Sequence, residues 1–396
     1  MGERLALHGG QPVRAQMLPY GRQALDEADV AAVVESLRSD WLTTGPRVAE
    51  FERRVAERVG VRHAVAVSSG TAALHAAAFA AGLGPGDEAI VPPLTFAATA
   101  NAVLYQGATP VFADVLPDTL TLDPARVREQ LTARTRAIVA VDFAGHPADL
   151  DELRALARTQ GLALLDDAAH ALGAEYRGRP VGGRADLTTF SFHPVKHVTT
   201  GEGGMVVTDD AALAERVARF RNHGITTGHA ERFQSGEWFY EMVDLGFNYR
   251  LTDVQCALGL SQLGKLDRFL ARRAAIAARY REALGRLPGV ALQTVAPDVR
   301  HAWHIFPLLL DLDRLAADRR AIFAALRAEG IGVNVHYIPV YWHPYYQRLG
   351  YPKGLCPVAE RAYERLLTLP LFPAMEDRDV EDVVTAVRRV ITHYAR

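Results

Sequence analysis

The strongest constraint on the fold is a regular alternation of short β-rich runs with helical patterns from about residue 62 to residue 208. All but one of the β-rich runs are apolar throughout, and they lack polar alternation, which predicts strands that are buried on both faces. Strands that alternate with helices in this way are typical of a mostly parallel α/β sheet covered by helices. The seven runs are residues 64–67, 89–91, 110–112, 137–141, 162–165, 188–190 and 205–207.

The last third of the chain follows a different pattern, in which helices dominate and strands are few. We expect helices up to about residue 287, near 317–329 and over 377–394, with strand-like runs at 304–310 and 331–335. This order fits a smaller α+β domain. A chain of 396 residues commonly forms more than one domain. We therefore expect a large α/β domain with an N-terminal arm over residues 1–255 and a small domain over residues 256–396.

Composition argues against several classes of function. The formal net charge is -2, with 23% charged residues, and this gives no basic field for nucleic acid or anionic lipid. The apolar segment 71–83 is too short to span a bilayer and predicts a buried helix. The beginning of the sequence predicts neither an export signal nor a lipid anchor. Cys256 and Cys356 lack the spacing of a disulfide framework or zinc site, so we expect a cytoplasmic location.

Lys196 is the first candidate for catalysis. It lies five residues after Ser191 and shortly before the glycine-rich turn 201–204. A lysine amine is a useful nucleophile when it forms a Schiff base with a carbonyl, and pyridoxal 5'-phosphate (PLP) is its commonest partner of this kind. The glycines would let the backbone turn tightly beside the lysine, although an ordinary β-turn uses the same residues.

A second motif predicts a phosphate site. Residues 68–74 follow the first predicted strand and open a helix, so the backbone amides around Gly70 and Thr71 could hold a phosphate. An ordinary helix cap that uses Ser69 or Thr71 would explain the same residues.

Two carboxylates follow a predicted strand and are expected at the carboxyl edge of the sheet, where α/β sheets bind ligands. A carboxylate there could keep a pyridine nitrogen protonated, so that the ring can take up electrons. Asp167 is the better candidate, whereas Asp166 could cap the next helix or bridge. His170 could equally be a core histidine. Phe96 could be a core residue or stack on a ring.

Seven motifs occur together in one order, and their combination resembles the DegT/DnrJ/StrS-type sugar aminotransferases of the fold type I PLP class over nearly the whole chain. The resemblance implies a large domain built on a mostly parallel seven-stranded sheet. The motifs are Ser-Gly-Thr, Pro-Leu-Thr-Phe, Asp-Ala-Ala-His, Ser-Phe-His-Pro-x-Lys, Gly-Glu-Gly-Gly, Arg-Asn-His-Gly and Gly-Phe-Asn-Tyr-Arg.

The resemblance also implies roles for individual residues. Lys196 would be the Schiff-base lysine and proton shuttle, Asp167 the partner of the pyridine nitrogen, and Phe96 the stacking aromatic. His170 would lie near the phenolic oxygen of the cofactor, at a position where many family members carry Gln. The phosphate would be held by Gly70, Thr71 and Ser191, joined by Asn248 of a second subunit. An active site shared in this way implies a homodimer.

Among the branches of this family, the motifs around Lys196, residues 239–250 and residues 335–340 look most like the transaminase of the pseudaminic acid pathway. The implied reaction moves the amine of L-glutamate to carbon 4 of a UDP-linked 4-keto-6-deoxy-N-acetyl-hexosamine and forms UDP-4-amino-4,6-dideoxy-N-acetyl-β-L-altrosamine. Contacts to the nucleotide sugar would come from Tyr20, Trp41, Thr43, His336 and Tyr337, with Arg250 at the diphosphate. These aromatic side chains could instead pack the two domains together.

Several alternatives stay open. The acceptor could be a keto sugar linked to dTDP or GDP. A PLP-dependent sugar dehydratase would carry His in place of Lys196, and the adjacent His197 makes that alignment worth checking. A non-catalytic regulator would keep the fold without turnover, but the sequence has no basic DNA-binding module. His301 and His304 lie three residues apart without further ligands in a familiar spacing, so we expect packing there and no metal site.

Overall fold

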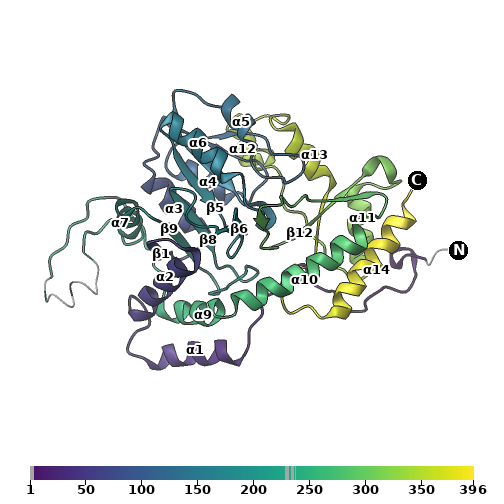
Figure 1. The fold of residues 1–396 in the computed structure, drawn as a ribbon, viewed down its shortest axis with the longest axis horizontal. Helices are drawn as coiled ribbons and strands as arrows, with labels where there is room; N and C mark the ends of the chain where they lie inside the picture. The colour runs from purple at the N-terminus through teal and green to yellow at the C-terminus, as the bar shows by residue number, and fades with distance from the viewer. Residues whose placement is uncertain (1–3, 228–231, 233–235, 237) are drawn as a thin grey trace.

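The computed structural model describes residues 4–227, 232, 236 and 238–396. At its centre lies a seven-stranded sheet with the order β1-β9-β8-β5-β4-β2-β3 and with helices on both sides (Figure 1). Within this sheet β9 runs antiparallel to both neighbours, and the remaining pairs are parallel. The strands are β1 (His63–Val67), β2 (Glu88–Val91), β3 (Thr109–Phe112), β4 (Thr135–Val141), β5 (Ala163–Asp167), β8 (Leu187–Ser191) and β9 (Gly204–Thr208).

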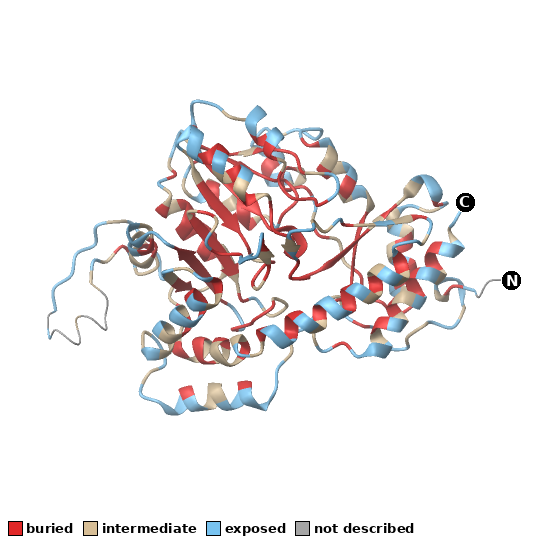
Figure 2. Cartoon of the chain, viewed as in Figure 1, coloured by how far each residue is buried: buried red, intermediate tan, exposed pale blue. Residues whose placement is uncertain are grey.

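Each of the seven β-rich runs in the sequence forms a strand of this sheet, which confirms the predicted α/β class. Successive side chains point to opposite faces, and both faces are buried, as the uninterrupted apolar runs predicted (Figure 2). Val139 and Leu165 belong to one buried cluster, whereas Ile138 and Leu164 belong to another on the opposite face. The covering helices are α2 (Pro46–Val59), α3 (Gly70–Ala80), α4 (Ala98–Tyr105), α5 (Pro124–Glu129), α6 (Leu150–Gln160) and α7 (Ala211–Phe220).

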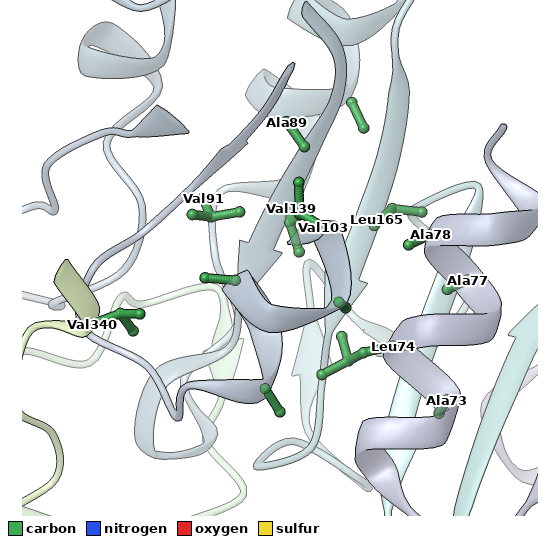
Figure 3. Packing of buried hydrophobic residues seen from close by; sticks show 14 of the residues in the cluster. Ala73, Leu74, Ala77, Ala78, Ala89, Val91, Val103, Val139, Leu165 and Val340 are labelled. Atoms are coloured by element: carbon green, nitrogen blue, oxygen red, sulfur yellow. The ribbon is translucent and has the colours of Figure 1, made fainter. Parts of the chain in front are cut away.

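Helix α3 lies close against the sheet because its buried face consists mostly of alanine. Leu74 and Ala78 lie on the side of the helix that faces Leu165, and Ala73 and Ala77 belong to the same buried cluster (Figure 3). Small side chains allow a helix to approach a sheet closely without leaving voids. The buried helix predicted at residues 71–83 is confirmed, although it ends at Ala80. Its beginning is thereby held beside the carboxyl ends of the central strands.

A three-stranded antiparallel sheet forms a second core, with the order β10-β12-β13. The three helices expected in this part of the chain are confirmed, as is the strand predicted at residues 304–310. The prediction of a strand-like run at residues 331–335 was wrong. Ile331 bridges to Leu18 and Asn334 bridges to Thr368, so the segment changes partner before a continuous ladder can form. The elements are β10 (Val290–Leu292), β12 (Phe306–Leu310), β13 (Leu366–Leu369), α10 (Leu266–Leu284), α11 (Arg319–Ala328) and α14 (Asp377–His393).

The remaining elements are short or lie at the periphery. In the described part of the chain, no helix is both long enough and apolar enough to cross a membrane. The remaining elements are α1 (Glu27–Arg38), α9 (Asp253–Leu263), α12 (Pro344–Arg348), α13 (Pro357–Arg365), β6 (Glu175–Tyr176), β7 (Arg179–Pro180) and β11 (Val299–Arg300), with 3-10 turns at Ala6–His8, Phe143–Gly145, Leu312–Arg314 and Val340–Trp342.

The long helix α10 takes part in both cores. Leu266 and Leu270 pack in one cluster with Phe51 of α2, whereas Ile276 and Tyr280 pack around the small sheet. The division into domains at residues 255 and 256 stays a prediction.

Glu329 ties the N-terminal arm to the second core. Its side chain is fully buried, accepts hydrogen bonds from the backbone amides of Ala6 at 2.9 Å and Val13 at 3.0 Å, and pairs with Arg389 at 2.9 Å. A buried carboxylate with three partners stabilises the fold as long as every partner is present. This contact fixes the arm that leads toward Tyr20.

We predict that Glu329→Ala lowers the free energy of unfolding by about 3 kcal/mol, because two buried backbone amides lose their acceptor and Arg389 loses the ion pair with Glu329. Glu381→Ala is the matched control, since Glu381 pairs with Arg279 on the exposed surface and should change stability by less than about 1 kcal/mol. Urea denaturation followed by circular dichroism measures both. Equal stability of the two variants would contradict the assigned anchor.

Candidate active site

A cavity of about 390 Å³ lies where the carboxyl ends of β5 and β8 meet the beginning of α3. Parallel strands present their carboxyl ends at one edge of the sheet, and ligands of α/β proteins bind there. Ten of the residues predicted from the sequence line this cavity. They are Tyr20, Gly70, Thr71, Phe96, Asp167, His170, Ser191, Lys196, His336 and Tyr337.

One side of the cavity has the form of a phosphate cradle. Ser69 caps α3 by accepting a hydrogen bond from the Ala72 amide at 3.0 Å, so the cap considered from the sequence is present. Gly70 lies so close to β8 that an added Cβ would come within 2.9 Å of the Ser191 Cβ. The helix beginning and the hydroxyls of Thr71 and Ser191 therefore face the same space, which fits a phosphate dianion.

Asp167 ends β5 and is buried on the face of the sheet that α4 covers. Its Oδ2 accepts a hydrogen bond from the Thr99 hydroxyl at 2.6 Å, and its Oδ1 accepts one from the Ala169 amide at 3.2 Å. Burial raises the pKa of Asp167, while these two hydrogen bonds and the charge of Lys196 act in the opposite direction. A cationic nitrogen placed at this carboxylate would favour its ionised form.

Asp166 points away from the cavity, as the alternation along a strand requires. It does not line the cavity, its side chain is fully buried, and desolvation, with the nearby carboxyl of Asp142 adding, raises its pKa well above the ordinary value. Asp166 is thus not placed to meet a ligand of Lys196. The sequence interpretation that favoured Asp167 over Asp166 agrees with this geometry.

Lys196 lies in the loop after β8, and its Nζ is 3.4 Å from Nε2 of His304. Burial lowers the pKa of Lys196 to about 8, because desolvation outweighs the attraction of Asp167, and Arg273 lowers it further. A lysine with this pKa has a considerable fraction of free amine near neutral pH. It is therefore suited to attack a carbonyl carbon.

Three aromatic groups stand beside the lysine. His170 Nε2 and the Tyr337 hydroxyl are 3.0 Å apart, and the rings of His170 and His304 have centroids 4.3 Å apart. Burial lowers the pKa values of both histidines well below the ordinary value, with Lys196 adding to the effect. Both imidazoles are thus neutral at physiological pH and can donate or accept a hydrogen bond.

The mouth of the cavity is aromatic. Phe96 is 61% exposed, and its ring centroid lies 6.2 Å from that of Tyr337. Tyr20 and His336 have centroids 5.2 Å apart on the other side, and His336 Nδ1 lies 2.9 Å from the Thr368 hydroxyl. An exposed phenyl ring at the rim of a cavity is available to stack on a planar ligand.

Four predicted residues do not line the cavity. Asn248 is exposed and its backbone bridges to Asn222, whose side chain accepts a hydrogen bond from Arg250 at 2.7 Å. Trp41 and Thr43 lie in the loop before α2, where Thr43 bridges to Thr252. These four residues belong to two neighbouring surface segments of the same subunit.

Residues 23–388 match the model of the DegT/DnrJ/EryC1/StrS aminotransferase family. The chain belongs to this family. The spore coat polysaccharide biosynthesis protein SpsC of Bacillus subtilis is 44% identical over 96% of this chain and 98% of its own length. The architecture is accordingly that of fold type I PLP-dependent transferases, and the enzyme is a PLP-dependent aminotransferase.

Two solved structures show the same fold. Helicobacter pylori PseC, described as an aminotransferase involved in the biosynthesis of pseudoaminic acid, has a TM-score of 0.89 and 33% identity, covering 96% of this chain and all of its own. The PLP form of the putative sugar aminotransferase Spr1654 of Streptococcus pneumoniae has a TM-score of 0.89 and 30% identity, covering 95% and 99%. The family resemblance inferred from the seven motifs is confirmed.

The sequence analysis missed two residues of this site. His304 was interpreted as a packing residue, yet it lines the cavity and contacts Lys196. Thr99 was passed over, yet it donates a hydrogen bond to Asp167. Thr99 lies three residues after Phe96 and near the start of a helix, and this position could have identified it from the sequence. His304 comes from a distant part of the chain, and no local pattern marks it.

We predict that Gly70→Ala weakens PLP binding about tenfold or more, because the new methyl group meets Ser191 and displaces a wall of the cradle. Gly84→Ala is the control, since a Cβ there meets only Asp87 at 4.0 Å. Titration of apoenzyme with PLP, followed by absorbance, gives both dissociation constants. An unchanged constant for Gly70→Ala would show that the phosphate binds elsewhere.

Proposed function

We propose that the enzyme transfers the amino group of L-glutamate to the 4-keto carbon of a UDP-linked 4-keto-6-deoxy-N-acetyl-hexosamine. The product would be UDP-4-amino-4,6-dideoxy-N-acetyl-β-L-altrosamine. One observation carries the proposal, namely a single cavity in which Lys196 and Asp167 face a phosphate cradle. The likeness to PseC and to a polysaccharide biosynthesis protein supports a sugar acceptor.

In this proposal Lys196 has two tasks. It holds PLP through its amine before the donor enters, and afterwards, as a free amine, it moves a proton to and from the carbon that carries the transferred nitrogen. PLP supplies the aldehyde and a ring that can take up electrons when that proton leaves. The low pKa of Lys196 favours both tasks, since each requires the unprotonated amine.

The neighbouring residues orient the ring. Asp167, fixed by Thr99 and Ala169, would hold a proton at the pyridine nitrogen. His170 would meet the phenolic oxygen, and Phe96 would stack on the ring face. Gly70, Thr71 and Ser191 would bind the phosphate.

We also propose a homodimer with shared active sites. Asn248 is exposed and does not line the cavity of its own subunit, so a second subunit can present it there. The preceding segment carries exposed apolar side chains, among them Trp238 at 82% and Leu245 at 78% exposure. Clustered apolar exposure of this kind marks an interaction surface.

The nucleotide sugar would enter at the aromatic rim formed by Tyr20, His336 and Tyr337. Arg250 and the loop with Trp41 and Thr43 would approach the diphosphate from the second subunit, since they lie near Asn248 in sequence or in space. A cytoplasmic location stays a prediction.

We predict that glutamate abolishes the visible absorbance of the PLP form, and that only the correct keto sugar restores it. UDP-linked, dTDP-linked and GDP-linked 4-keto sugars are added one at a time to the glutamate-treated enzyme. Restoration by the UDP-linked N-acetyl sugar alone supports the proposed acceptor, and restoration by another nucleotide replaces it.

Lys196→Ala is the control for this experiment. The variant should lose the absorbance of the covalently held cofactor and at least about 1,000-fold in turnover, because both tasks of the amine are removed. Full transamination by this variant would refute the role of Lys196.

We predict that mixing two inactive variants, Lys196→Ala and Asn248→Ala, restores activity after subunit exchange. A hybrid dimer contains one site in which an intact Lys196 meets an intact Asn248 of the other subunit, so about one quarter of the wild-type activity should return. Light scattering checks the dimer. If Asn248 acted within its own subunit, every hybrid site would lack one residue and no activity would return.

A further inference from the structure

Arg273 is a buried cation that the proposed chemistry does not use. It lies on α10, is 1% exposed, and pairs with no carboxylate among the residues that the structure describes. Its guanidinium instead donates hydrogen bonds to backbone carbonyls, which carry only partial charge. A buried charge is costly unless its partners are well placed, so an arginine kept in such surroundings needs a specific reason.

The carbonyls that Arg273 binds come from three separate segments. Nη1 donates to Trp303 at 3.2 Å, to His304 at 3.0 Å and to Leu371 at 3.0 Å, while Nη2 lies 3.4 Å from the carbonyl of Val195. Val195 immediately precedes Lys196. The guanidinium therefore joins the loop that carries the lysine to the residue whose ring touches the lysine amine.

The segment around His304 is held from its other side by backbone bonds. The amides of Ala302 and His304 donate to the carbonyls of Gly145 and Ala144, both at 2.9 Å. Arg273 binds this segment from another side and also reaches the loop that carries Lys196. His197, the residue after Lys196, adds a second link, since its Nε2 lies 2.9 Å from the carbonyl of Ala302. The planar fork of arginine suits several carbonyls at once, which a lysine ammonium cannot match.

We propose that Arg273 is a positioning residue that fixes the approach of His304 to Lys196 and, through its charge, favours the unprotonated form of the lysine amine. This inference rests on the proposed role of Lys196. It extends that role by naming what sets the protonation state of the amine when PLP is not attached to it.

Electrostatics support the geometric argument. Arg273 lowers the pKa of Lys196 and also adds to the low pKa values of His197 and His304. Burial lowers the pKa of Arg273 itself to about 9, which leaves it charged where Lys196 titrates. The groups that act on or with Lys196 in this region are Asp167, His170, His197, His304, His336 and Arg273.

The test uses the three lysines of the chain, Lys196, Lys265 and Lys353. Apoenzyme is labelled briefly with an amine-reactive reagent between pH 6 and pH 10, and mass spectrometry of the separate peptides gives the labelling rate of each lysine. Lys353, on the surface beside Trp342, is the internal reference. No turnover is required, so a failure of this inference is distinguishable from a failure of the proposed function.

We predict that Arg273→Met shifts the labelling midpoint of Lys196 upward by about one pH unit, and that labelling below the midpoint slows about tenfold. The labelling rate of Lys353 should not change between the variant and the wild type. Arg272→Met is the matched control, since Arg272 is the neighbour on α10 and binds Met375 and Asp377 at the surface. A Lys196 midpoint that stays in place in folded Arg273→Met would overturn the inference.

Two further variants keep the test decisive where Arg273→Met fails to fold. Arg273→Gln keeps amide donors for the carbonyls but no charge, and should raise the midpoint as well. Arg273→Lys keeps the charge, so its midpoint should match the wild type, while kcat of the loaded enzyme falls about tenfold because the fork is lost. A raised midpoint in Arg273→Lys would show that charge is not the cause and would contradict the inference.

Discussion

The close approach of α3 to the end of β8 is the contact on which the cavity depends. Gly70 lies against Ser191, and Gly204 lies against the backbone of Ser69, so neither position has room for a side chain. The alanine-rich face of α3 makes this approach possible along the whole helix (Figure 3). The same helix thus packs against the core and forms one side of the phosphate cradle.

Local pattern predicted the central sheet well. All seven runs became strands because a strand buried on both faces lacks polar alternation, and a run of a few residues is enough to show this. The error at residues 331–335 has the opposite cause. Ile331 and Asn334 have suitable strand character, but their partners, Leu18 and Thr368, lie far away in sequence and on different segments. Which segments Ile331 and Asn334 pair with depends on the whole fold and cannot be seen in the local sequence.

The same contrast explains the site. Asp167 was predicted because it directly follows a predicted strand, where position in the sheet decides position in the site. The role of Ser191 came from the family resemblance. His304 and Arg273 were not predicted, because they reach Lys196 only after the second core has folded against the first. His304 is 108 residues from Lys196 in sequence, and Arg273 is 78 residues from Val195. Taken alone, the residue types of His304 and Arg273 are as consistent with a packing role as with a role in the active site.

The distribution of charge in the cavity bears on the second subunit. Among the described residues that line it, Lys196 is the one lysine or arginine, while Asp167 and Glu202 are acidic and the buried histidines are neutral. PLP and a nucleotide diphosphate would together bring several negative charges, which the lining of one subunit cannot balance. Arg250 lies outside that lining, two residues from Asn248. In the proposed dimer, a subunit that delivers Asn248 to the phosphate would also deliver the guanidinium of Arg250 toward the diphosphate, so the shared site would also balance the charge of the ligands.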